Sequence, residues 1–211
     1  ARQAGSVFSG ILTDRAACIM RHRYLPMWSS PLIWIAIAIA LFWAVGAYNR
    51  LVRLRSAVVQ AFGSLDAHLI RWLAMLGEFD AAQVTAGALD RDARSTLHGS
   101  TTQLTASLAV ARARPLQGDA VAALSAACAV LDAVWLNLQP GGDTDDAIRK
   151  MAPWRARWDD LHKHNEQAAQ LFNEAVLQYN AAIRQFPAAA VAWVFGFTPA
   201  RALSIAREGN S

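Results

Sequence analysis

The chain has 211 residues, of which 55% are hydrophobic and only 17% are charged, and its formal net charge at pH 7 is +4. This composition excludes an intrinsically disordered chain, which combines low hydrophobicity with high charge. It is also too apolar for an ordinary soluble domain, in which about 25% of residues are charged. The two cysteines, Cys18 and Cys128, are too few for a disulfide framework or a zinc module.

A long uncharged stretch follows the first thirty residues, which form an N-terminal flank. No charged residue occurs between Arg23 and Arg50, and the stretch supplies the roughly 20 residues that a helix needs to cross a bilayer. Aromatic residues near both of its ends are typical of membrane–water interfaces. We therefore predict a transmembrane helix at residues 31–48. The predicted membrane-anchor residues are Leu32, Ile33, Trp34, Ile35, Ile37, Ile39, Leu41, Phe42, Trp43 and Val45.

Two other interpretations of this stretch are a buried core helix and a cleaved signal peptide. A signal peptide is disfavoured because the apolar run starts late and lacks a clean small-x-small cleavage site. A retained membrane anchor is the interpretation that the length and the flanking residues favour.

Arginine residues flank the stretch on both sides. Arg21 and Arg23 precede it, and Arg50, Arg53 and Arg55 follow it. So close to a membrane, these side chains suit anionic lipid head groups better than nucleic acid, at about 1 kcal/mol each. Because basic residues are nearly balanced between the two sides, the positive-inside rule does not decide the orientation.

The pattern of residues 49–187 predicts an antiparallel up-and-down bundle of helices, because apolar residues recur there every three or four positions. No proline lies between Leu32 and Arg114, so we expect the anchor to continue directly into the first bundle helix. The apolar pattern fades between Gly77 and Gly87, where we expect a bend or a loop.

The second and third bundle helices are predicted from shorter patterns. The second runs from about Leu89 to Ala113, and the third follows Gly118, with Asp119 as its N-terminal cap. The predicted inner face of the third helix contains Val121, Leu124, Cys128, Leu131, Trp135 and Leu138.

The fourth helix has the longest periodic pattern, from Met151 to Phe186, and Pro187 ends it. Asn165 is the only polar residue on this stripe, and we expect it to find a hydrogen-bond partner or to point into water. The aromatic residues expected to be buried on the stripe are Trp154, Trp158, Phe172, Tyr179 and Phe186.

Residues 188–211 form an apolar C-terminal segment, whose first ten residues are too short to span a bilayer. They either fold against the end of the bundle or form a surface for the membrane interface or a second copy of the chain. We predict self-association, because a bundle of this size cannot easily hide every large apolar group. The predicted oligomer contacts are Val191, Trp193, Val194, Phe195 and Phe197.

Two segments resemble the opening and closing signatures of the LemA family. The opening segment is YNRLVRLR at residues 48–55, and the closing segment comprises FNEAV at 172–176, QYN at 178–180, IRQFP at 183–187 and FGF at 195–197. The sequence WLAMLGE at 72–78 departs from the family pattern, so the chain resembles a divergent member. The resemblance implies a bacterial membrane protein with one N-terminal transmembrane helix, a helical bundle and no settled biochemical activity.

The sequence predicts no catalytic residue, no metal site and no cofactor. It has no phosphate-binding glycine-rich loop, nucleophile elbow or HExxH motif, and its four glutamates are too few for a di-iron bundle. We expect a solvated helix face formed by Asp159, Asp160, His162, Lys163, His164 and Glu166. Asn49, Asn173 and Asn180 are expected to bond a neighbouring helix or the bundle end, with a polar binding cleft as the alternative.

These observations predict an all-α, single-pass membrane protein that acts as a non-enzymatic scaffold or interaction module and self-associates. Its expected partners are membrane lipids, other copies and other membrane proteins, but not nucleic acid. We expect the bacterial inner membrane, with the bundle on the cytoplasmic side. The alternative is a membrane-proximal sensory or ligand-binding bundle, which an internal pocket with converging polar groups would favour.

Overall fold

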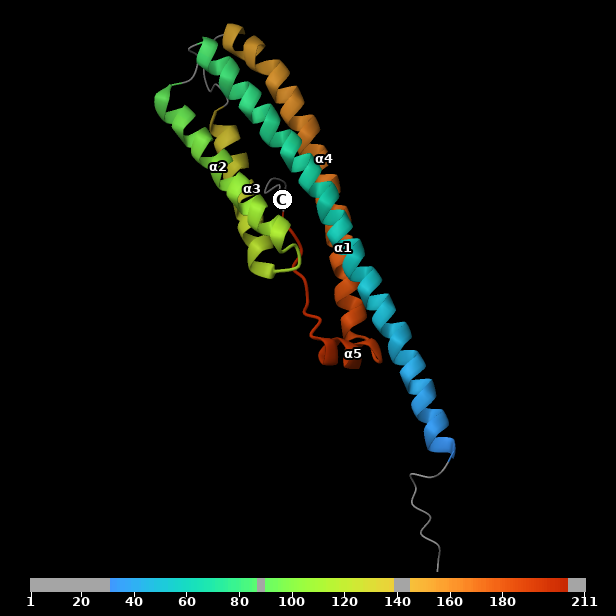
Figure 1. Ribbon diagram of the computed structural model, residues 1–211. Coiled ribbons are helices and arrows are strands. Elements are labelled where there is room, and N and C mark those ends of the chain that lie inside the picture. Colours follow the sequence, from blue (N-terminus) through green and yellow to red (C-terminus); the bar gives the residue numbers. More distant parts are fainter. Residues whose placement is uncertain (1–30, 87–89, 139–144, 205–211) are drawn as a thin grey trace, which may run out of the picture. The chain divides into compact units, whose positions relative to one another are not determined.

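The computed structural model describes residues 31–86, 90–138 and 145–204, and these residues form five helices and no strand (Figure 1). The predicted all-α class is therefore confirmed. The helices are α1 (Pro31–Ala86), α2 (Arg91–Ala113), α3 (Gly118–Asn137), α4 (Asp145–Arg184) and α5 (Ala188–Phe195).

Helix α1 is a single helix of 56 residues, as the absence of proline predicts. The bend expected from Gly77 onward is wrong, because α1 continues to Ala86. Phe79 lies in this part of α1, is 1% exposed, and packs edge-on against the rings of Trp135 and Trp154. Tertiary packing of this kind outweighs the low helix propensity of a glycine.

The chain divides into two compact units, Ala1–Trp43 and Ala44–Ser211. The described part of the first unit is Pro31–Trp43, at the start of α1. The second unit holds the rest of α1 and the other four helices.

Helices α1 and α2 of the second unit run in opposite directions (Figure 1). Arg112 near the end of α2 forms an ion pair of 2.7 Å with Asp66 in α1. Arg94 near the start of α2 forms one of 2.9 Å with Asp80, which lies later in α1. Exposed ion pairs contribute little free energy, so these two mainly record the antiparallel register.

Aromatic contacts show that α4 is antiparallel to α1. Phe62 in α1 lies against Phe172, with ring centroids 5.8 Å apart, and Trp72 lies against Trp158 at 4.7 Å, ten residues later in α1 and fourteen earlier in α4. The indole of Trp158 also stacks on Trp135 of α3 at 4.3 Å, with the ring planes 7° apart. The four long helices therefore form the up-and-down bundle that periodicity predicts.

The inner face predicted for α3 is confirmed, since Val121, Leu124, Cys128, Leu131 and Trp135 are all buried. Leu138 is only half-buried, at the end of the helix. The predicted cap is wrong. Asp119 lies in the first turn of α3, where a carboxylate suits the helix dipole, and Gln117 occupies the N-cap position without a side-chain hydrogen bond.

The stripe along α4 is confirmed up to the point where the helix ends. Trp158, Phe172 and Tyr179 are buried and Trp154 is half-buried. Phe186 is 82% exposed, so its predicted burial is wrong. Because α4 ends at Arg184, the helical period no longer directs the side chain at position 186 toward the core.

An extended segment, residues 198–204, follows α5 and is called the strap here. Two asparagine side chains of α4 hold it, each by a pair of hydrogen bonds to one strap residue. The Nδ2 of Asn173 donates to the Leu203 carbonyl at 2.8 Å, and its Oδ1 accepts from the Leu203 N–H at 2.7 Å. Asn180 makes the same two bonds to Ala200, at 2.8 and 2.9 Å. The two asparagines form hydrogen bonds as expected, but their partner is the strap and not a neighbouring helix.

The strap completes the core of the bundle. Ala200 and Leu203 are buried, at 7% and 3% exposure. The Tyr179 hydroxyl donates to the Thr198 carbonyl at 3.0 Å, and the Ser204 N–H donates to the Ser125 hydroxyl of α3 at 3.2 Å. The strap therefore joins α3 and α4 with a chain segment that has no helical periodicity.

Candidate functional site

The start of α1 is apolar and exposed. Every predicted anchor residue is exposed, from 37% at Ile33 to 82% at Phe42. By length and hydropathy this part of α1 is capable of crossing a membrane, and none of its most apolar window is buried. Membrane anchors and signal sequences share this property. A core helix of a soluble protein does not, because its apolar side chains would be covered.

Helix α3 is also long and apolar enough to cross a membrane, but half of its apolar window is buried. Its inner face is covered by the bundle, and Trp135 packs on the rings of Phe79 and Trp158. Helix α3 is therefore a core helix of the bundle.

The arginines that follow the apolar stretch are on the surface. Arg50, Arg53 and Arg55 are all exposed. Arg21 and Arg23 lie outside the described residues. Arg55 also acts on Tyr179 of α4. Burial raises the pKa of the Tyr179 hydroxyl, and the positive charge of Arg55 partly opposes that rise. Three cationic side chains within two helical turns suit contact with anionic groups.

Helix α5 packs against the first turns of α1 in the second unit. The ring of Phe195 lies 4.9 Å from that of Tyr48, centroid to centroid, and the ring of Phe197 lies 6.1 Å from it. Gly196 ends α5 in the left-handed conformation, with φ of 69°, which a glycine adopts without steric cost. The turn brings Phe197 back toward the bundle.

The predicted oligomer contacts divide into two groups. Val191 is buried, and Phe197 is half-buried against the core. Trp193, Val194 and Phe195 are exposed at 85%, 65% and 62%. The segment is thus folded against the bundle, and it leaves a small exposed apolar face, defined here by these three residues.

A cluster of acidic and histidine side chains lies between α3 and α4. The Nδ1 of His162 is 3.4 Å from the Oδ1 of Asp132, and its Nε2 is 3.4 Å from the Oε1 of Glu166. The imidazole also lies against the indoles of Trp72 and Trp158, at centroid distances of 5.9 and 6.2 Å. The predicted solvated face is wrong for His162 and Glu166, whose side chains are only 16% and 27% exposed.

Burial sets the ionisation of Asp132. Removal from water raises the pKa of this carboxyl to about 6, and the negative charge of Glu166 adds to the rise, whereas His162 opposes it. A charged carboxylate is costly at such a site because nearby apolar side chains solvate it poorly. The sequence gives one hint of this, since Asp132 is the only charged residue on α3 after its first turn.

Asn165 lies on the inner stripe of α4 and is 1% exposed. Within the described part of the chain, neither its Oδ1 nor its Nδ2 has a hydrogen-bond partner, and the same holds for the Nε1 of Trp72. The prediction that Asn165 finds a partner or points into water is therefore wrong. An unpaired buried amide costs about 1–3 kcal/mol.

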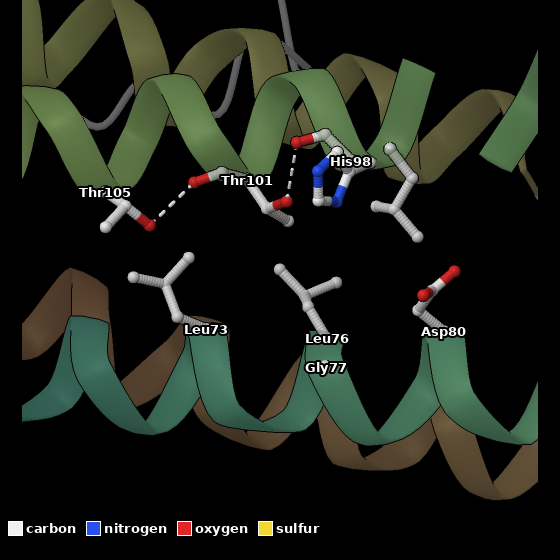
Figure 2. Close-up of a pocket in the computed structure, with 8 residues that line it drawn as sticks. Leu73, Leu76, Gly77, Asp80, His98, Thr101 and Thr105 are labelled. Atoms are coloured by element: carbon white, nitrogen blue, oxygen red, sulfur yellow. Dashed lines mark hydrogen bonds between the residues drawn. The ribbon is translucent and has the colours of Figure 1, made fainter. Parts of the chain in front are cut away.

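A shallow pocket of about 170 Å³ lies between α1 and α2 (Figure 2). Its lining residues are Leu73, Leu76, Gly77, Asp80, Leu97, His98, Thr101 and Thr105. The hydroxyls of Thr101 and Thr105 donate to the carbonyls of His98 and Thr101 in their own helix (Figure 2).

The two threonine hydroxyls of this pocket are thus already engaged, whereas the imidazole of His98 also lines the pocket. Asp80 is paired with Arg94, and the leucine side chains point from α1 toward α2 (Figure 2). Ligand pockets usually enclose about 300–1,000 Å³ and contain polar groups that converge on the ligand. This pocket is smaller, and the His98 imidazole alone does not make a converging set.

Among the described residues, no group of three or more His, Cys, Asp or Glu side chains is arranged to hold a metal ion. Cys128 is 1% exposed, and burial together with the charge of Asp132 raises its pKa to about 12. The buried thiol thus behaves as a small apolar side chain.

Comparisons of the chain with protein-family models, with curated proteins and with solved structures gave no match.

Proposed function

We propose that the protein is a single-pass, membrane-anchored helical scaffold without enzymatic activity, related to the LemA family. The observation that carries the proposal is the exposed apolar start of α1, where all ten anchor residues are at least 37% exposed. Exposing so much apolar surface to water is costly, at about 25 cal/mol per Å². The hydrocarbon core of a bilayer removes that cost.

The scaffold role is supported by the kind of surfaces that the bundle presents. The shallow pocket between α1 and α2 has no converging set of polar groups, whereas the start of α1 and part of α5 are apolar and exposed. Exposed apolar patches commonly mark contacts with a partner or a membrane. A sensory or ligand-binding bundle is the weaker candidate on these grounds.

Self-association is the second part of the proposal. Anchors in one membrane hold the copies of the chain in one plane with one orientation, which raises their effective concentration. Side-by-side packing of anchors is the contact that we expect. Particle mass in mild detergent at micromolar concentration tests this part, and a monomer at that concentration would contradict it.

Membrane insertion is tested by expressing the full chain in bacterial cells and extracting the membranes with alkaline carbonate. The wild type should resist extraction. The double variant Ile39→Arg/Leu41→Arg should become extractable, because each arginine at the centre of a span costs about 2.5–3.5 kcal/mol.

The matched control is Val110→Arg/Leu136→Arg, which adds the same two charges at exposed apolar positions of α2 and α3. This control should remain in the membrane fraction. Extraction of the wild type, or retention of the Ile39/Leu41 variant, would contradict the proposed anchor.

The proposed location is the bacterial inner membrane, with the bundle in the cytoplasm. A cysteine at position 136, which is 66% exposed in the wild type, reports the side of the membrane in a Cys18→Ser background. A membrane-impermeant maleimide should label Leu136→Cys only after the inner membrane is permeabilised. Labelling in intact spheroplasts would place the bundle on the outer side.

A further inference from the structure

Helix α5 carries three large apolar side chains that the described chain leaves mostly uncovered. Trp193, Val194 and Phe195 are 85%, 65% and 62% exposed. Trp193 and Val194 lie on the side of the helix opposite Ala188, Val191 and Ala192, which are buried against the bundle, whereas Phe195 ends the helix beside Tyr48. A helix that is apolar all round is normally buried on all sides. The bundle covers only one side of α5, so a second apolar environment is needed for the other.

The location of this face along the chain limits what can cover it. The ring of Phe195 contacts Tyr48, and Tyr48 is the last residue of the predicted span at residues 31–48. Because Phe195 is in contact with Tyr48, α5 lies at the level at which the predicted span would leave the bilayer.

The side chains at this level have the chemistry of a membrane interface. Tryptophan and tyrosine are enriched where hydrocarbon meets head groups, and Trp193, Phe195 and Tyr48 gather here. Arg50 and Arg53 are exposed on the next turn of α1, where anionic head groups would neutralise them.

A second copy of the chain fits this face less well. The face consists of two aromatic side chains and one valine, and aromatic side chains bury about 150–250 Å² each. The total of about 500 Å² falls below the roughly 800 Å² per partner that stable protein interfaces bury. Val191 and Phe197, which would have enlarged the face, are already covered by the bundle.

We propose that α5 is an interfacial membrane contact, in which Trp193, Val194 and Phe195 enter the lipid head-group region beside the anchor. The proposal rests on the proposed anchor, and it adds a second contact of a different kind. A span alone leaves open the tilt of α1 in the bilayer and its rotation about its own axis. The second contact fixes which end and which side of the bundle lie on the bilayer.

Spin labelling of the full chain in vesicles of phosphatidylcholine and phosphatidylglycerol tests the proposal. The label is attached at Val194→Cys, which leaves Trp193 and Phe195 in place, in a Cys18→Ser background. Native Cys128 stays unlabelled because it is 1% exposed. The measured quantity is the ratio of collision rates with oxygen, which concentrates in lipid, and with a polar nickel complex, which concentrates in water.

The matched control is a label at Leu136→Cys. Leu136 is 66% exposed, so it resembles Val194 in exposure and apolarity. Its neighbour Trp135 packs on Phe79, which lies 31 residues after Tyr48 in α1, or about 46 Å away along the helix. A label at Ile39→Cys reports the anchor independently.

The oxygen-to-nickel ratio at position 194 should be several-fold higher than at position 136, with a depth of about 5–10 Å below the head-group surface. In the additional presence of Trp193→Ser and Phe195→Ser, the ratio at position 194 should fall to the value at position 136, while circular dichroism shows unchanged helix content.

Three outcomes would overturn the proposal. Equal ratios at positions 194 and 136, with the Ile39 label in lipid, would show α5 in water beside an intact anchor. Low collision rates with both reagents, and spin–spin broadening that disappears when unlabelled chain is added, would identify a second copy as the partner. A water-like ratio at Ile39 would contradict the proposed function itself.

Discussion

Asn173 and Leu203 exchange two hydrogen bonds between a helix side chain and an extended backbone, and Asn180 repeats the arrangement with Ala200. The two asparagines are seven residues apart, so they lie on one face of α4, separated by two turns. A primary amide has a donor and an acceptor side by side, which matches the N–H and C=O of a single extended residue. Two such amides fix both the position and the direction of the strap.

Replacing the two asparagines should loosen the strap. Asn173→Ala and Asn180→Ala each remove two hydrogen bonds and leave backbone groups of a partly buried residue without partners. We expect each variant to lose about 1–3 kcal/mol of unfolding free energy. Trypsin should also cleave after Arg201 faster than in the wild type, because cleavage requires local opening. Asn49→Ala, at an exposed position of α1, should change neither measurement.

Stability should depend on pH through Asp132. Its carboxyl has a pKa of about 6 in the folded protein, above the value of about 3.9 in an unfolded chain. Between these values the folded state binds the proton more strongly, so stability falls as pH rises through this window and stays lower above it. Asp132→Asn should be more stable than the wild type at pH 7, by on the order of 1–3 kcal/mol, and similar to it near pH 4.

Urea unfolding at several pH values measures this dependence. The control is Asp159→Asn, which removes one negative charge from an exposed position of α4 and should leave the shape of the pH profile unchanged. A wild-type profile that rises from pH 4 to pH 7 by the amount lost in Asp132→Asn would show that the carboxylate stabilises the fold.

The inner stripe of α4 should contribute most through Phe172. This ring is fully buried and packs edge-on against Phe62. Phe172→Ala should lower the unfolding free energy by about 3–5 kcal/mol, because it leaves a cavity in the core. Leu171→Ala, one residue earlier and 59% exposed, should cost less than about 1 kcal/mol. Similar losses for the two variants in denaturant titrations would refute the assignment of Phe172 to the core.

Two glycines should respond in opposite directions to alanine. Gly63 is in the interior of α1 with open space around the position of a Cβ, so Gly63→Ala should raise the stability by about 0.5–1 kcal/mol. Gly196 has φ of +69°, and Gly196→Ala should lower the stability by about 1–2 kcal/mol. Thermal unfolding of both variants in the same detergent measures the difference. A stabilised Gly196→Ala would contradict the conformation at the end of α5.

The helices were predictable because each has a long apolar period, but their ends were not. The stripe that contains Phe172 continues in the sequence to Phe186, while the helix stops at Arg184. Periodicity describes only which residues would share a face if the helix continued. The same limit explains the wrong prediction of a bend or loop from Gly77 onward. The apolar pattern is weak there, but the packing of Phe79 against α3 and α4 keeps the segment helical.

The cluster of Asp132, His162 and Glu166 was not predictable, because its members come from two helices whose relative rotation depends on core packing. The pair His162 and Glu166 is visible as an i, i+4 spacing, but that spacing is common on solvated faces. The strap was also missed, because an extended segment without alternation has no periodic signal. The seven-residue separation of Asn173 and Asn180 was the one sign of it in the sequence.

The strap also imposes an order on biosynthesis. Ala200 and Leu203 complete the core between α3 and α4, yet the ribosome makes them after every helix of the bundle, while the apolar start of α1 emerges much earlier. The asparagine pair of a nascent chain thus stays unoccupied until synthesis is nearly complete. During that interval the sites on α4 that will receive Ala200 and Leu203 are open to chaperones and to neighbouring nascent chains.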